Sequence, residues 1–305
     1  MTVSFNTGAS PPWWDDGMNT PDFDAAASFI GGHARVLDRR RFSRLFLDGE
    51  AAPVRDAVAA YRNADGGFGH ALEPDCRCDA SQPAAVAMAL HVMDECDAWD
   101  VTLVSSACDW LVSVAPAGGG AAFVLPTVSQ GPRAPWWVVP EGNPVSFIQT
   151  GTICRALYAR GFSHPWLDGA TEAMWTMLEK TEQADPYGWF GILAFLENVP
   201  DTTRAREVFD RIGPALAKVV ELDPDAAGEV HGPLAFAPVP DSLARVLFDQ
   251  SVIDVHLDRL AAGQGDDGGW TFNFLSWSPA AELDWRGAIT VDALRTLRAN
   301  GRPLF

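Results

Sequence analysis

NADGGFGHALEPDCRCDASQP (residues 63–83) follows a helical pattern with a tight glycine turn, and it contains one histidine, four carboxylates and two cysteines. A second stretch, HLDRLAAGQGDDGGW (256–270), ends in the same kind of turn. In both stretches a helix is expected to stop at Asp-Gly-Gly-aromatic, because glycine adopts backbone conformations that other residues avoid. The recurrence predicts a chain built from similar helix pairs.

Two kinds of helical segment alternate along the chain. Apolar residues recur at three- and four-residue steps, and no convincing alternation of period two is present. The amphipathic segments are 101–114, 164–180 and 201–220, and the segments that are apolar almost all round are 83–95, 145–159 and 188–199. A helix that is apolar all round is buried on all sides. The pattern therefore predicts outer helices that cover inner ones.

Local signals predict several helix boundaries. Asp24 is expected to cap a helix that runs through Asp38, and Pro83 suits the first turn of an inner helix. The last helix is expected after Arg286-Gly287, with Gly301 as its C-terminal cap. A break of about 25 residues ends at Asn143-Pro144, and loops of that length in compact domains are usually functional.

These patterns predict an all-α fold. The expected architecture is a single (α/α) toroid or barrel of about 10–12 helices in inner and outer rings. A closed form is favoured over a solenoid because no polar capping repeat is evident at either end. Residues 1–22 include Pro11-Pro12 and Trp13-Trp14 without periodicity and are expected to form an extended N-terminal arm, and residues 23–305 form the toroid domain.

Composition and charge limit the partners. The chain has 22 Lys plus Arg against 40 Asp plus Glu, a formal net charge of -18. This balance argues against nucleic acid and against an anionic membrane surface, so the expected partner is a small molecule. No apolar run approaches the ~18 residues that span a bilayer. Five cysteines and no secretion-signal pattern predict a cytoplasmic protein with reduced thiols, and the oligomeric state is left open.

The repeated turns carry a family resemblance. GQGDDGGW (263–270) resembles the QW motif of terpene cyclases of the squalene-hopene cyclase type, and DGGFG (65–69) resembles the Gly-Gly-Phe turn of protein prenyltransferase β subunits. NADGGFGHALEPD (63–75), NPVSFIQTG (143–151) and GPLAFAPVPDS (232–242) also resemble a prenyltransferase-like group of actinobacterial type. The resemblance implies an α/α toroid that binds an isoprenoid or another apolar molecule in a central cavity and cyclises or transfers it.

The acid motif of those cyclases, Asp-X-Asp-Asp, is incomplete. DASQPA (79–84) lies where the motif would start, with Asp79 in its first position and Ser81 and Gln82 in place of two carboxylates. The segment before it still holds residues suited to proton transfer. We therefore take His70, Glu73, Asp75 and Asp79 as candidate catalytic residues.

A zinc site is an alternative for the same segment. Protein prenyltransferases bind zinc through an Asp, a Cys two residues later and a distant His, and this chain offers Asp75, Cys76 and Cys78. The register differs, because the residue two after Asp75 is Arg77. No complete magnesium motif is found either. We expect no cofactor, with zinc or magnesium as alternatives, and a solvated acidic loop with two free thiols is a further reading.

Other residues are candidates for ligand binding. Gln82 begins the inner helix, and Asp284 and Arg286 are expected where the last inner helix begins, although an ion-pair role is open for them. Trp136 and Trp137 could line an apolar or cation-stabilising pocket or pack in a core. For Gln264 and Trp270 we expect a structural role in the turn.

Three functions fit the sequence, and whether the protein is an enzyme is left open. The first is a terpene cyclase- or prenyltransferase-like protein that acts on an isoprenoid. The second is a non-catalytic toroid that binds an apolar ligand. The third is an (α/α)6 carbohydrate-active hydrolase, in which Glu73 or Asp75 pairs with Glu282 or Asp284 across a cleft.

Overall fold

The chain is all-α, as predicted. The computed structural model describes residues 20–304, which form twelve α-helices, two short 3₁₀-helices and isolated bridges but no β-strand. The α-helices are α1 Phe23–His33, α2 Val36–Phe46, α3 Ala52–Ala59, α4 Pro83–Glu95, α5 Val101–Val114, α6 Phe147–Ala159, α7 Pro165–Lys180, α8 Pro186–Leu196, α9 Thr202–Leu216, α10 Pro233–Phe236, α11 Gln250–Ala262 and α12 Pro279–Ala299. Residues 1–19, most of the predicted arm with Trp13-Trp14, lie outside the described residues.

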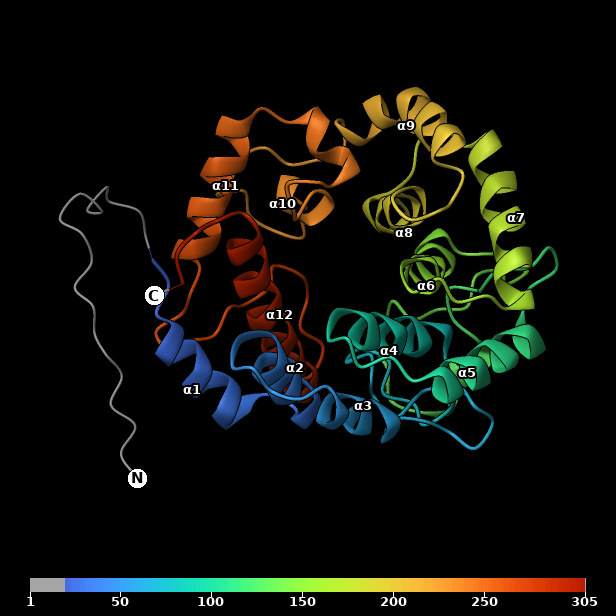
Figure 1. The fold of residues 1–305 in the computed structure, drawn as a ribbon, viewed down its shortest axis with the longest axis horizontal. Helices are drawn as coiled ribbons and strands as arrows, with labels where there is room; N and C mark the ends of the chain where they lie inside the picture. The colour runs from blue at the N-terminus through green and yellow to red at the C-terminus, as the bar shows by residue number, and fades with distance from the viewer. Residues whose placement is uncertain (1–19, 305) are drawn as a thin grey trace.

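The helices alternate between two positions. In Figure 1 the odd-numbered helices follow the periphery of the molecule, and the even-numbered helices lie inside them. Helix α4 packs on α6, α6 packs on α8, and α12 contacts α1, α2 and α11. The core consists mainly of apolar side chains from the helices between α3 and α9, and a second cluster joins α1, α11 and α12. The segments predicted to be apolar all round, 83–95 and 188–199, are indeed inner helices.

The predicted helix from Asp24 through Asp38 is wrong, because the chain breaks between α1 and α2. Ala34 and Arg35 are extended, with ψ of 157° and 156°. The guanidinium of Arg35 donates from Nη1 to the carbonyl oxygen of Leu72 at 2.8 Å. The cap of α1 also lies two residues earlier than the predicted Asp24, since the carboxylate of Asp22 accepts from the amide of Ala25. A tertiary contact thus overrides a continuous helical pattern.

The predicted start of the last helix is also wrong. Helix α12 begins at Pro279, and the hydroxyl of Ser278 caps it by accepting a bond from the amide of Ala281 at 3.2 Å. Ser278-Pro279 is a standard helix-start signal that the sequence reading missed. As a result, Asp284 and Arg286 lie inside the first two turns of α12 rather than before it.

Helices α6 and α8 cross at a pair of glycines. A Cβ on Gly191 would lie 2.0 Å from the carbonyl oxygen of Phe147, and a Cβ on Gly151 would lie 2.0 Å from the carbonyl oxygen of Gly191. No other residue allows two helix backbones to approach this closely without moving them. The crossing therefore depends on these two glycines.

The two Asp-Gly-Gly-aromatic turns share one geometry. Gly66 and Gly268 have φ of 95° and 89°, a left-handed conformation that favours glycine. In each turn the preceding aspartate accepts a bond from the amide of the second glycine, Asp65 from Gly67 at 2.9 Å and Asp267 from Gly269 at 3.1 Å. The aromatic residues Phe68 and Trp270 are buried. The repeat seen in the sequence is thus a repeat of structure.

A buried ion network connects three inner helices. Arg41 of α2 is 3% exposed and binds Asp38 at 3.1 Å, Glu95 of α4 at 2.9 Å and Asp292 of α12 at 2.8 Å. Arg295 of α12 also lies 3.4 Å from Glu95. Burial raises the pKa of Glu95, but the attraction of Arg41 and His91 outweighs it and holds that pKa well below its ordinary value. The network ties the last helix of the chain to the first inner ones.

The connections that precede the even-numbered helices meet on one side of the molecule, which we call the loop face. They are residues 34–35, 60–82, 115–146, 181–185, 217–232 and 263–278. The bonds among them and the adjoining helix starts are Arg35 Nη1 to Leu72 O (2.8 Å), Arg77 N to Pro132 O (3.0 Å), Ala134 N to Asp75 O (2.8 Å), Asn273 Nδ2 to Val230 O (2.7 Å) and Tyr187 Oη to Glu229 Oε1 (2.5 Å). The loop face therefore gathers polar residues from the whole chain.

Candidate functional site

Two buried carboxyl groups, Glu73 and Asp75, lie on the loop face. The chain enters their segment through His70 and Ala71, which have φ of 55° and 63°, and Leu72 is fully buried and anchors it. Glu73 is 6% exposed and Asp75 is 4% exposed. The peptide of Asp75 is held by the bond that its carbonyl oxygen accepts from Ala134. Turn geometry and backbone pairing thus point both side chains inward.

Glu73 is a neutral acid at pH 7. Burial raises its pKa from 4.5 to about 8, and the negative charge of Asp75 adds to the shift. Nearby amides of Cys76 and Asp75 and the charge of Arg35 oppose it without cancelling it. Its Oε2 atom is buried and has no hydrogen-bond partner. Glu73 therefore holds a proton that no protein group accepts.

Asp75 has different surroundings. Burial raises its pKa too, but the indole N–H groups of Trp285 and Trp277 and the charge of Arg77 lower it. Neither indole completes a hydrogen bond of normal geometry, and both Nε1 atoms are buried without a partner. The site thus combines two carboxyl groups whose pKa values burial raises, and the N–H dipoles of two tryptophans partly offset this rise at Asp75.

An ion pair from α12 borders the acid pair. Arg77 donates from Nη1 to Asp284 Oδ2 at 2.5 Å, so Asp284, a predicted ligand-binding residue, reaches the loop face but is engaged by Arg77. Tyr61 lies near Arg35, Arg77 and Asp284, and burial raises its pKa. The acid pair therefore has a charged and phenolic edge.

Aromatic side chains form the other edges. Phe274 meets Trp285 edge-on at 5.6 Å. On the α8 and α10 side, the ring of His231 contacts Tyr187 and Phe190 at centroid distances of 5.4 and 5.3 Å. Burial lowers the pKa of His231, and Tyr187 is close enough to Asp75 for its pKa to respond to that charge. These rings offer apolar and π surfaces beside the carboxyl groups.

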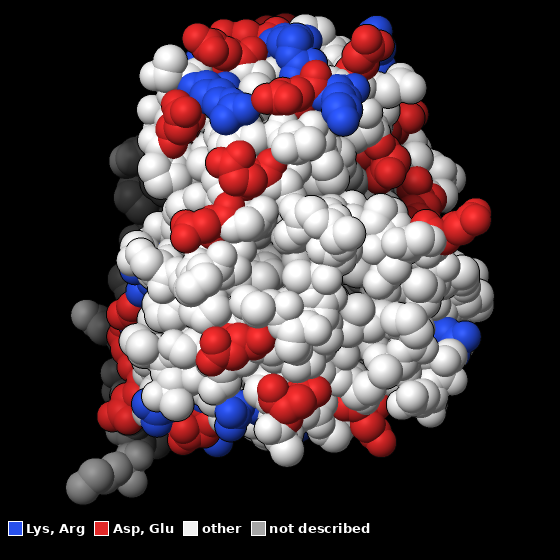
Figure 2. Space-filling view, turned by 90° about the vertical axis from the view of Figure 1, so that its right-hand side faces the viewer, with Lys and Arg blue, Asp and Glu red and all other residues white. Residues whose placement is uncertain are grey.

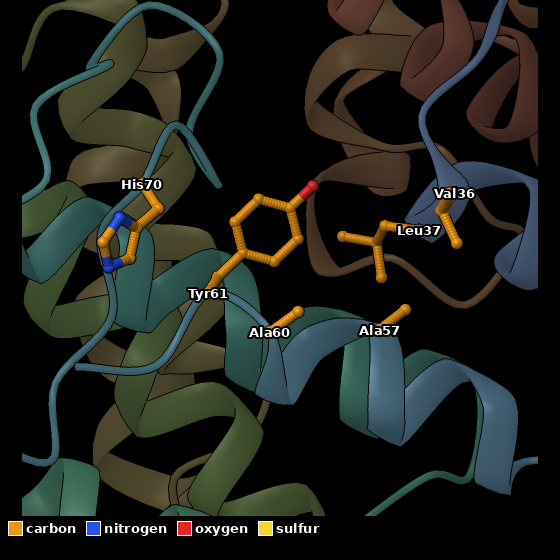
Figure 3. A pocket seen from close by; sticks show the side chains of 6 residues that line it. All are labelled: Val36, Leu37, Ala57, Ala60, Tyr61 and His70. Carbon is orange, nitrogen blue, oxygen red and sulfur yellow. The ribbon is translucent and has the colours of Figure 1, made fainter. Parts of the chain in front are cut away.

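The structure separates His70 and Asp79 from the acid pair. A pocket of about 490 Å³ opens between α2 and α3 and is lined by Val36, Leu37, Ala57, Ala60, Tyr61 and His70 (Figure 3). His70 reaches Asn63 Oδ1 at 2.8 Å, and the side chain of Asp79 is 94% exposed. Figure 3 shows the Tyr61 ring between His70 and Leu37, so Tyr61 borders both the pocket and the Arg77–Asp284 edge.

Gln82, Arg286 and the tryptophan pair all make contacts within the fold. Gln82 is 1% exposed, donates to Thr127 Oγ1 and accepts from the amide of Leu125, both at 2.8 Å, so it fastens the long loop before α6. Arg286 donates to Asp267 Oδ1 at 2.7 Å in the second glycine turn. Trp137 is buried and stacks on Phe123, and Trp136 is exposed.

The cysteine pair lies next to Asp75 without a metal cluster. No group of three or more His, Cys, Asp and Glu side chains within residues 20–304 is arranged to hold a metal ion. The Sγ atoms of Cys76 and Cys78 are 3.8 Å apart, and both thiols are free. The zinc alternative built on Asp75, Cys76 and Cys78 therefore lacks a further ligand in this structure.

Sequence reasoning missed the aromatic partners of the acid pair. Trp277 directly precedes Ser278-Pro279, and Trp285 directly follows Asp284 in α12. Tyr187 lies in the first turn of α8. The one signal in the sequence was their position. Like Glu73 and Asp75, each of these aromatic residues lies near the start of an inner helix or in the connection before it. Nothing local to these tryptophans points to a carboxylate 200 residues earlier.

Surface charge and helix length agree with the composition. On the face in Figure 2, Lys and Arg are interspersed with Asp and Glu near the top, where α9 lies, and a broad uncharged area lies below. This face shows no continuous basic patch among the described residues. No helix within residues 20–304 is long and apolar enough to cross a membrane.

Comparisons with known proteins support the fold alone. No protein-family model and no curated protein matches the chain. Among solved structures, the chain is similar to one described as the crystal structure of a protein from Actinoplanes, with a TM-score of 0.52 and 14% identity over 92% of each chain. At this identity, the likeness extends to the all-α architecture of the chain.

Proposed function

We propose that the protein is an α/α toroid of the terpene cyclase and prenyltransferase type, and that it acts on an apolar, isoprenoid-like small molecule through acid catalysis at the loop face. The observation that carries the proposal is Glu73, a buried carboxyl group that keeps its proton at neutral pH and has an unpartnered Oε2. The alternation of peripheral and inner helices and the paired glycine turns support a closed arrangement.

The pKa of Glu73 indicates which atom it protonates. A general acid works best when its pKa is near the operating pH, and a value of about 8 suits an oxygen more than a bare double bond, which needs a stronger acid. We therefore assign a substrate with an oxygen at its reacting end, such as an epoxide, an alcohol or an ether.

Each residue then has a defined task. The proton moves from Glu73 to the substrate oxygen, the C–O bond breaks, and Glu73 becomes a carboxylate. Asp75 and the aromatic faces of Trp285 and Tyr187 stabilise the positive charge that develops on carbon. A later proton transfer back to Glu73 restores the acid.

The proposal is tested with Glu73→Gln, which keeps the shape of the side chain and removes the proton donor. Purified protein is incubated with polyprenyl alcohols and epoxides, and product is measured by mass spectrometry. We expect turnover by the wild type to fall at least about 100-fold in the variant and to decline above pH 8, where Glu73 loses its proton.

Glu141→Gln is the matched control, because Glu141 is an exposed carboxylate in the 115–146 connection of the same face. Unchanged turnover in Glu73→Gln would sink the assignment. An apolar ligand that co-purifies in native mass spectrometry, without turnover, would favour the non-catalytic toroid instead.

Glycoside hydrolysis is a second candidate, and one observation favours it. Glu73 and Asp75 are two neighbouring carboxyl groups, and the charge of Asp75 raises the pKa of Glu73; a pair of carboxyl groups is what a glycosidase requires. The predicted partners Glu282 and Asp284 are less suited, since Asp284 is bound to Arg77. If the wild type hydrolyses chromogenic aryl glycosides and Glu73→Gln does not, glycoside hydrolysis would be favoured over the first proposal.

A further inference from the structure

Cys76 and Cys78 are a dithiol pair beside the acid site. Their Sγ atoms are 3.8 Å apart, and the side chains are 3% and 1% exposed. Cys76 forms an isolated antiparallel bridge with Arg133, and residues two apart in an extended segment point to the same side. The backbone thus presents the two sulfur atoms to each other.

The surroundings hold the pair in place. An apolar cluster of loop residues encloses it, and this cluster consists of Ala84, Val124, Val128, Ala134 and Trp137 with Trp277 packed against it. A Cβ on Gly131 would come 2.7 Å from the Cα of Cys78, so the absence of a side chain there lets the two segments pack closely. Because the cluster is apolar, the nearest reactive partner of each thiol is the other.

The two thiols differ in reactivity. The hydrogen bond from Cys76 lowers the pKa of Cys78 to about 7 against the effect of burial, and the same bond raises the pKa of Cys76. Cys78 is therefore the more acidic of the two thiols, and the thiolate is the nucleophilic form. A thiolate next to a second thiol is the arrangement of a redox cysteine with its resolving partner.

We propose that Cys76 and Cys78 form a reversible redox pair that closes to a disulfide when a small hydroperoxide reaches Cys78. The Cys78 thiolate attacks one peroxide oxygen, the O–O bond breaks, and a sulfenic acid forms on Cys78 while the other oxygen leaves as an alcohol, or as water from hydrogen peroxide, after taking a proton. The sulfur of Cys76 then attacks the Cys78 sulfur, the S–O bond breaks, and water leaves with the proton of Cys76. Two electrons pass from the sulfurs to the peroxide, and a dithiol reductant restores them.

Closure of the disulfide changes the acid site. The sulfur atoms must approach from 3.8 Å to about 2.05 Å, which shifts a segment that begins directly after Asp75. Arg77 lies between the cysteines, and its amide and guanidinium bind Pro132 and Asp284. Oxidation is therefore expected to move Asp75 and Arg77 together. The disulfide itself does not depend on the proposed function, so the two can fail separately.

The test treats the folded full-length protein with hydrogen peroxide and measures intact mass and free thiols after denaturation. We expect the loss of two hydrogen atoms and a fall from five free thiols to three, with the link found in the peptide that contains residues 76–78. Cys76→Ser and Cys78→Ser should abolish the disulfide. Cys96→Ser, which removes a buried thiol away from the pair, should leave it unchanged.

A second readout does not depend on cysteine variants. Trp137 lies in the cysteine cluster and Trp277 packs against it, and a nearby disulfide quenches indole fluorescence. Oxidation should therefore lower tryptophan emission, and Trp137→Phe combined with Trp277→Phe should remove most of that change. Sulfinic or sulfonic acid on either cysteine, a disulfide between other cysteines such as Cys108 and Cys154, or five thiols that persist while free cysteine is oxidised would each overturn the proposal.

Discussion

Glu73 links folding to pH through its raised pKa. In the unfolded chain the group ionises near 4.5, whereas in the folded protein it keeps its proton up to about pH 8. The folded state therefore holds more protons between these values, and its free energy of unfolding falls as the pH rises. Below pH 4.5 the group is protonated in both states and costs nothing.

We expect Glu73→Gln to stabilise the protein increasingly across this window. The gain relative to wild type should grow by roughly 1.4 kcal/mol for each pH unit between 4.5 and 8 and then level off. Urea unfolding of both proteins at several pH values measures it. Glu141→Gln should show no such trend, and a flat difference for Glu73→Gln would mean that the folded carboxyl is ionised at neutral pH.

At the residue scale the sequence could predict which residue types matter but not where each side chain lies. His70, Glu73, Asp75 and Asp79 were chosen from one irregular segment, and the structure buries only Glu73 and Asp75. The left-handed residues His70 and Ala71 turn the chain there, so no helical or strand period relates one side chain to the next. Without a helical or strand period, the spacing of residues in the sequence does not predict the direction in which each side chain points.

At the element scale, the crossing of α6 and α8 makes a sharp prediction. Gly191→Ala places a Cβ against the carbonyl oxygen of Phe147 at 2.0 Å, and the two backbones must separate. We expect a loss of about 3 kcal/mol in the free energy of unfolding, seen as a lower melting temperature by circular dichroism. The loss should appear although alanine is the better helix former.

Gly169→Ala is the matched control, because Gly169 lies within α7 and nothing lies within 4 Å of the added Cβ. That variant should be more stable than wild type by roughly 0.5–1 kcal/mol. If both variants gain stability, the close approach of α6 and α8 does not exist.

Helix boundaries were predictable where the signal is local. Pro83 begins α4 and Glu95 ends it, as the proline and the apolar run indicated. The break at Ala34 and Arg35 was not predictable, because it depends on the bond from Arg35 to Leu72. The Ser278-Pro279 start of α12 was readable from the sequence but lies in a stretch without hydrophobic periodicity.

At the scale of the whole molecule, Arg41 holds three inner helices together. Its removal takes one cation from the buried Asp38 and Glu95, which keep Arg35 and Arg295 as partners, so the cost should lie below the 3–5 kcal/mol typical of an uncompensated buried charge. We expect Arg41→Ala to lose roughly 2–3 kcal/mol of stability at pH 7, measured by denaturant unfolding. The deficit should shrink at acid pH, where the wild type loses the stabilisation that the lowered pKa of Glu95 provides.

The neighbouring Arg40→Ala supplies the control, since Arg40 is exposed on the same helix. It should change the free energy of unfolding by less than about 0.5 kcal/mol. Equal losses in the two variants would assign the effect to the helix rather than to the network.

The composition of the site was beyond sequence reasoning at this scale. An all-α chain with alternating outer and inner helices was predictable from periodicity alone. Which connections meet was not, because Trp277 and Trp285 reach Asp75 only after the chain has turned through all of its helices. A single sequence records the order of elements and not their final neighbours.

The hydrogen bonds between Gln264 and Asp22 can form only late in synthesis, when both ends of the fold have been made. The amide of Asp22 donates to Gln264 Oε1, and Gln264 Nε2 donates to Asp22 O, both at 2.7 Å and across 242 residues. At 5–20 residues per second, a ribosome needs roughly 12 to 50 seconds to bridge that gap. Until then Phe29 and Ile30 of α1 lack the partners from α11 and α12 that bury them. Helix α1 is thus the segment that a nascent-chain chaperone must protect longest.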